Sequence, residues 1–101
     1  MDYPTAEQII KQEYEGCKNF MTPHVIRYGK IRSQTKHCKK VVAYELSSGR
    51  GFRDNTIYGV SVVSWDPITN TTERMTKLSD CFGSLRKAED YIEILKERED
   101  L

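Results

Sequence analysis

The chain has no marked excess of charge of either sign and no long apolar run, and both absences restrict what it can be. Its 101 residues carry 16 basic and 15 acidic side chains, a formal net charge of +1. This near balance argues against a surface that attracts nucleic acid or an anionic membrane everywhere. No stretch approaches the roughly 18 apolar residues of a membrane span, and the N-terminus lacks a basic segment followed by an apolar one. We therefore expect a cytoplasmic protein that does not enter a membrane.

Cysteine is also scarce. The three cysteines, Cys17, Cys38 and Cys81, are odd in number and widely spaced, which is not the pattern of a secreted disulfide scaffold. They form no Cys-x-x-Cys pair, and the two histidines, His24 and His37, form no His-x3-His pair. Because metal ligands normally recur at such spacings, we expect reduced thiols and no metal site.

Motifs for nucleotide binding and for catalysis are missing or incomplete. Gly49-Arg50-Gly51 lacks the length and the lysine-serine or lysine-threonine ending of a phosphate-binding loop. Cys81 shortly precedes the last predicted helix, whose N-terminus could activate a thiol, but a small buried thiol is the favoured interpretation. We therefore expect no cofactor and no enzymatic activity, and thiol catalysis with a histidine is the third hypothesis for function.

What the sequence does contain is one long uncharged run at residues 56–65, Thr-Ile-Tyr-Gly-Val-Ser-Val-Val-Ser-Trp. Its β-branched and aromatic composition is typical of a central strand. The alternate side chains of a strand point to opposite faces, and neither set is polar enough to be simply solvated. Both faces of this strand therefore need a covering partner.

Two helices are predicted, one at each end of the chain. Thr5 followed by Gln8 fits a capping box, and apolar residues then recur at helical spacing over 6–19. Ser84 is the predicted N-cap of a helix that runs to about residue 97, with an apolar stripe on one side. We expect residues 97–101 to fray.

Three further strands are predicted at 24–32, 39–46 and 71–79, with a mobile loop at 47–55. The chain then forms one α+β domain over residues 1–101, a four-stranded antiparallel sheet in the order α-β-β-β-β-α. We expect two layers, with both helices on the face of Tyr58, Val60 and Val62. The alternative, given equal weight, is that the first helix or the hairpin at 24–46 covers the other face.

The other face supports the first hypothesis for function. It would present Ile57, Val63 and Trp65, a patch too apolar to be left in water. We expect a non-catalytic interaction or accessory protein that forms a homodimer or binds a protein partner through this face.

The second hypothesis rests on uneven charge. Between residues 27 and 40 six basic side chains occur and no acidic one, which predicts a basic hairpin able to follow a phosphate backbone. The arginines of the following loop could support it. This nucleic-acid-binding module would use Arg27, Lys30, Arg32, Lys36, Lys39, Lys40, Arg50 and Arg53.

The start of the last predicted helix, Gly83-Ser84-Leu85-Arg86-Lys87-Ala88, loosely resembles the opening of the last helix in double-stranded-RNA-binding domains. The order of helix, antiparallel strands and helix is also similar, and it implies RNA binding. The match covers six residues, the basic pair is displaced by one position, and the double alanine within that helix is absent. We assign no family on this basis.

Overall fold

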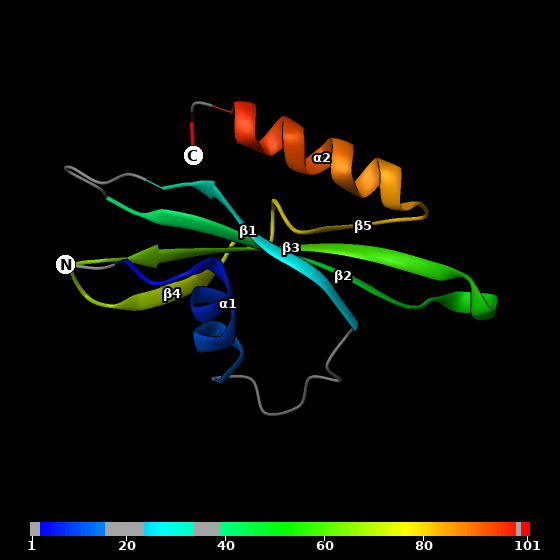
Figure 1. Cartoon of the computed structure of the whole chain (residues 1–101), viewed down its shortest axis with the longest axis horizontal. Coiled ribbons are helices and arrows are strands. Elements are labelled where there is room, and N and C mark those ends of the chain that lie inside the picture. Colours follow the sequence, from blue (N-terminus) through cyan, green and yellow to red (C-terminus); the bar gives the residue numbers. More distant parts are fainter. Residues whose placement is uncertain (1–2, 16–23, 34–38, 99) are drawn as a thin grey trace.

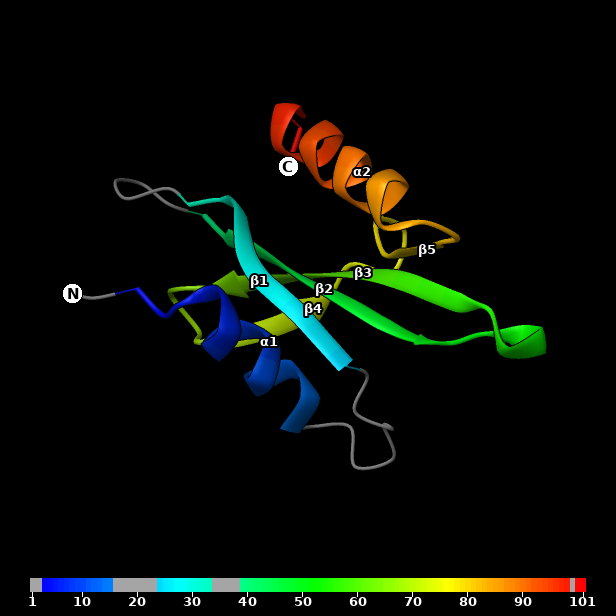
Figure 2. The same cartoon turned by 45° about the vertical axis from the view of Figure 1, so that its right-hand side comes forward.

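The computed structural model describes residues 3–15, 24–33, 39–98 and 100–101, and it consists of an antiparallel sheet with a helix on each side (Figure 1). A view turned by 45° keeps the two helices on opposite sides of the sheet (Figure 2). The α+β class and the terminal helices are as predicted. The elements are α1 (Ala6–Glu15), β1 (His24–Arg32), β2 (Val41–Arg50), the 3₁₀ turn η1 (Phe52–Asp54), β3 (Thr56–Asp66), β4 (Thr71–Arg74), β5 (Asp80–Phe82) and α2 (Leu85–Glu97).

The sheet has the order β1-β2-β3-β4, and β5 pairs with the part of β3 that β4 leaves free. All pairs are antiparallel, and β3 is central, as its composition predicted. The strand predicted over 71–79 is interrupted after Arg74, because the amides of Leu78 and Ser79 both donate to the carbonyl oxygen of Met75. The strand predicted over 71–79 is therefore correct only as far as Arg74, and β5 begins at Asp80, just beyond its predicted end.

One side of the sheet packs against α2. The large apolar side chains of β2 and β3 that point to this side are fully buried against the apolar stripe of the helix, as the spacing predicted. Tyr58, Phe82 and Tyr91 close the edges of this core. The core residues are Val42, Tyr44, Leu46, Val60, Val62, Leu78, Ala88, Ile92 and Leu95.

The other side of the sheet packs against α1, so the prediction that both helices share one face is wrong and its alternative is confirmed. The molecule has three layers instead of two. The physical reason is the one visible in β3, whose two sets of side chains are both apolar and both need cover. The core on this side consists of Ala6, Ile9, Ile10, Val41, Ala43, Val63 and Trp65.

Both predicted helix caps are present. The Thr5 amide donates to Gln8 Oε1 at 2.8 Å and the Gln8 amide donates to Thr5 Oγ1 at 3.2 Å, which completes the capping box. Ser84 Oγ accepts from the amide of Lys87 at 3.2 Å. The predicted continuation of the first helix to residue 19 lies outside the described residues. In the described part of the chain no helix has the length and apolar character to cross a membrane.

The first four residues of the loop predicted over 47–55 are strand. Ser47 and Ser48 continue β2 and lie opposite Gly59 and Tyr58 of β3, so the hairpin extends past both helices (Figure 1). The connection is a short 3₁₀ turn closed by a 2.7 Å hydrogen bond from the Gly51 amide to the Asn55 carbonyl. The prediction was wrong because small residues common in turns also pair in a ladder, which needs only their backbone groups.

Candidate functional site

The basic residues predicted from the hairpin do not form one surface. Directly opposed residues of paired strands point to the same side of the sheet. Arg27 is opposite Leu46, on the side of α2, and Lys30 is opposite Ala43, on the side of α1. The positive charges of β1 are therefore divided between two faces.

The two ends of β2 separate the remaining predicted cations. Lys39 and Lys40 precede the strand, whereas Arg50 ends it, and ten residues of strand at about 3.3 Å each place these ends roughly 33 Å apart. At the far end Arg50 Nη1 lies 3.9 Å from Asp54 Oδ1, both highly exposed, and Arg53 is exposed there too. Lys36 lies outside the described residues.

Arg27 and Arg32 connect β1 to α2 and to the C-terminal residues. Arg27 Nε donates to the Tyr44 hydroxyl at 3.4 Å, and its Nη1 lies 3.0 Å from Glu89 Oε1 of α2; these two contacts raise the pKa of Arg27. Arg32 donates to the carbonyl oxygens of Arg98 and Leu101 at 2.8 and 2.9 Å. The C-terminal residues predicted to fray are thereby attached to β1, and Leu101 packs at the edge of the core.

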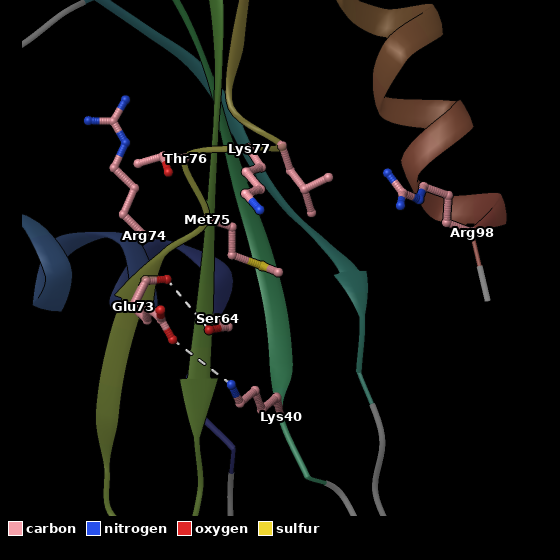
Figure 3. A pocket seen from close by; sticks show the side chains of 9 residues that line it. Lys40, Ser64, Glu73, Arg74, Met75, Thr76, Lys77 and Arg98 are labelled. Atoms are coloured by element: carbon pink, nitrogen blue, oxygen red, sulfur yellow. Dashed lines mark hydrogen bonds and ion pairs between the residues drawn. The ribbon is translucent and has the colours of Figure 1, made fainter. Parts of the chain in front are cut away.

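A pocket of about 500 Å³ on the α2 side brings together cations from three different segments (Figure 3). Lys40 comes from the segment just before β2, Lys77 from the turn after β4, and Arg98 from the position directly after α2. In Figure 3 Lys77 and Met75 extend into the space that faces Arg98, whereas Arg74 is directed to the other side of β4. Lys40 is the predicted residue in this pocket, and sequence reasoning missed Lys77 and Arg98.

The turn that carries Lys77 is firmly anchored. The Ser79 hydroxyl donates to the Met75 carbonyl at 3.0 Å and accepts from the Val62 amide at 3.0 Å. The Tyr91 hydroxyl of α2 donates to the Leu78 carbonyl. These hydrogen bonds fix the backbone of the turn that carries Lys77. Within the described ranges no acidic side chain forms an ion pair with Lys77.

Two exposed acids neutralise the other cations of the pocket. Lys40 Nζ lies 4.0 Å from Glu73 Oε2, and Arg98 makes two contacts with Asp100, at 2.6 and 3.0 Å. The hydrogen bond from Arg98 lowers the pKa of Asp100. Such exposed pairs contribute little to stability, because water and salt screen them. An incoming anion can therefore replace these acids at small cost.

The predicted interaction face is not a surface. Val63 and Trp65 are 0% and 6% exposed beneath α1, and the Trp65 indole donates to Asn70 Oδ1 at 2.8 Å. Ile57 is half-buried farther along β3, beside Gly51. Self-association through these three residues would require α1 to detach. The capping box and apolar stripe signalled a first helix with one side to bury, but they did not determine which face of the sheet it would cover.

The thiol hypothesis gains no geometric support among the described residues. Cys81 is exposed on β5, so the interpretation as a buried thiol is wrong. His24 lies on β1 at the opposite edge of the sheet, and His37 lies outside the described residues. The described ranges contain no group of three or more His, Cys, Asp or Glu side chains that could hold a metal ion.

Comparisons of this chain with protein-family models, with curated proteins and with solved structures gave no match.

Proposed function

We propose that this protein is a non-catalytic nucleic-acid-binding module whose phosphate contacts are Lys40, Lys77 and Arg98. The observation that supports this most directly is the convergence of three cations, from three segments, on one pocket of about 500 Å³. The proposal retains the nucleic-acid hypothesis and replaces most of its predicted residues. Of those, Lys40 stays in the site, Lys39 lies next to it, and Arg32 acts by positioning Arg98.

The chemistry of the pocket fits a phosphate backbone better than a single small anion. Each cation can neutralise one phosphate, and such contacts supply affinity without reading sequence. Met75 lies between the cations and offers an apolar surface to a sugar or base. With a net charge of only +1 on the whole chain, long-range attraction is weak, so we expect modest affinity that depends on local contacts.

Fluorescence polarisation with labelled 12-nucleotide single-stranded RNA, single-stranded DNA and duplex DNA tests this proposal. Three phosphate contacts predict a slope of log K against log salt of about −2 to −3. The double variant Lys40→Glu, Lys77→Glu should abolish binding. The matched control is Arg50→Glu, Arg53→Glu, which makes the same charge change at the far end of the sheet.

Two results would contradict the proposal. If both double variants lose affinity equally, net charge and not the pocket governs binding. If the wild-type protein binds none of the three nucleic acids at 50 mM salt, the pocket has another purpose. The variant Asp100→Asn sharpens the assay further, because releasing Arg98 from its carboxylate should increase affinity two- to fivefold.

A second candidate function is association with a protein partner or a second copy through the edge of the sheet. β1 ends the sheet, and Ile26 on it is 39% exposed. Irregular register on either side of Gly29 opposes continuous pairing along this edge. Sedimentation velocity from 10 to 500 µM tests this candidate, since a monomer at every concentration would exclude the homodimer. For either function we retain the cytoplasm as the proposed location, where the cysteine thiols would stay reduced.

A further inference from the structure

A second pocket, of about 370 Å³, lies on the other side of the sheet beside α1. Its walls include Tyr14 of α1, Val25 and Tyr28 of β1, and Glu45 of β2. The volume falls in the range of small-ligand sites, about 300–1,000 Å³. Two tyrosines and a carboxylate are therefore grouped around one cavity, away from the basic pocket.

Glu45 is unusual because it is a carboxylate in the centre of a sheet. It lies between Tyr28 and Ser61 on the neighbouring strands and is only 1% exposed. Its Oε1 accepts a hydrogen bond from the Tyr14 hydroxyl at 3.0 Å. Burial raises the pKa of Glu45, while the hydrogen bond from Tyr14 and the positive charge of Arg74 act in the opposite direction.

The partner of Glu45 is thus a neutral hydroxyl, and no cation of the described residues forms an ion pair with it. A buried carboxylate in that situation is costly unless a positive group approaches it. Tyrosine rings beside a carboxylate supply the other element that an organic cation prefers, because the face of an aromatic ring attracts positive charge. The buried carboxylate and the tyrosine rings of this pocket therefore both favour an organic cation as the ligand.

We propose that this pocket binds an alkylammonium group, with Glu45 as its counter-charge and with Tyr14 and Tyr28 as its aromatic walls. Lys11 at the rim does not fill this role, because its ammonium lies 3.0 Å from Glu7 Oε1 and is exposed. Glu15 also lines the pocket and adds negative charge to it. An alkylammonium in this pocket would lie between Glu15 and Glu45.

Choline and its neutral isostere 3,3-dimethylbutan-1-ol provide the direct test, with binding followed by the amide signals of Tyr28 and Glu45 in NMR titrations. The two probes share a shape and differ by one charge. We expect choline to bind at least tenfold more tightly than the alcohol. Equal affinity for the two probes, or no shift with either at 20 mM, would overturn the proposal.

The variant Glu45→Gln separates binding from folding. Glutamine keeps the size of the side chain and an oxygen that can accept from Tyr14, so the far-UV circular dichroism should stay unchanged. Choline affinity should fall at least tenfold, whereas the matched variant Glu89→Gln on the α2 side should leave it unaltered. A second variant, Tyr28→Leu, should weaken choline severalfold. If Glu45→Gln folds and binds choline as the wild type does, the pocket is not an ammonium site.

Two sources could supply the ammonium group, a free small molecule or a lysine side chain of a peptide. Titration with a trimethyllysine peptide and with the same peptide carrying norleucine at that position distinguishes them. Tighter binding of the trimethyllysine peptide than of choline assigns the site to a side chain. Equal binding of choline and that peptide, both above the norleucine peptide, assigns it to the free cation.

Discussion

The two faces of the sheet are covered by helices but are built differently. On the α2 side the buried side chains of β2 and β3 are apolar, and a 13-residue helix packs along them. On the α1 side the helix has 10 residues, and the rows of apolar side chains give way to Glu45, Ser47 and Ser61 toward the η1 end of the hairpin. One face is a continuous core, and the other is a core joined to a polar cavity.

This difference shows how one sheet can serve stability and binding together. The α2 face contains the larger group of buried apolar residues, and burial of apolar surface stabilises the fold. The basic pocket lies at the border of this face, beside the turn that carries Lys77.

The largest effect is expected from Ile92→Ala in α2. Ile92 is 0% exposed in the centre of the α2 core, so the change removes buried methylene groups and leaves a cavity. We expect a loss of about 2–5 kcal/mol in the free energy of unfolding, measured by urea denaturation. Ile94→Ala on the same helix is the control, since Ile94 is 58% exposed and its truncation should change stability far less. Equal losses would show that α2 does not pack as described.

A pair of glycine substitutions tests how closely the α2 face is packed at its edge. A Cβ at Gly29 of β1 would lie 2.6 Å from the ring and hydroxyl of Tyr44, whereas a Cβ at Gly49 of β2 would have nothing within 4 Å. Gly29→Ala should therefore destabilise by about 1–3 kcal/mol. Gly49→Ala should be neutral or stabilise by up to about 1 kcal/mol. The same urea assay decides, and a tolerated Gly29→Ala would mean that Tyr44 moves easily.

The sequence predicted the elements that rest on local chemistry. The capping box at Thr5, the N-cap at Ser84 and the uncharged run at 56–65 each determine an element through contacts between near neighbours. Which face of the sheet α1 covers depends instead on contacts between residues far apart in the sequence. Two arrangements had to be compared, one with both helices on the same face and one with a helix on each face. Because both sets of side chains of β3 were apolar, the sequence left these packings equally favoured.

The site was less accessible to sequence reasoning than the fold. The run of positive charge at 27–40 was real, but alternation along β1 divides Arg27 and Lys30 between two faces. Lys77 and Arg98 join Lys40 only through the turn after β4 and the docked C-terminus, and neither has a local signature. Glu45 lies within the strand predicted at 39–46, and a charged side chain among its apolar neighbours was the one available signal for the second pocket.

The helix caps test whether the two faces unfold together. Removing the hydroxyl with Ser84→Ala should cost about 1 kcal/mol, and Thr5→Ala on the other face should cost a similar amount. Both are measured by urea denaturation. A Thr5→Ala variant whose global stability is unchanged while the Ile9 and Ile10 amides exchange faster would show that α1 opens independently of α2.

The smallest effect is a pH dependence that belongs to the α1 face alone. Burial raises the folded-state pKa of Glu45 above its usual value near 4.5, so the folded protein holds this proton more tightly than the unfolded chain does. The resulting penalty is absent below the unfolded pKa, grows as the pH rises through the window between the two pKa values, and is fully present above the folded one. Glu45→Gln lacks this penalty and should gain stability relative to the wild type between about pH 4 and pH 7. The gain should be small because the hydrogen bond from Tyr14 favours the charged form.

Urea denaturation at several pH values measures this gain in stability, with Glu89→Gln on the α2 face as the control. A constant difference between Glu45→Gln and wild type across this range would show that Glu45 is no more costly to ionise than an exposed glutamate, and the contrast between the two faces would then lie in shape alone.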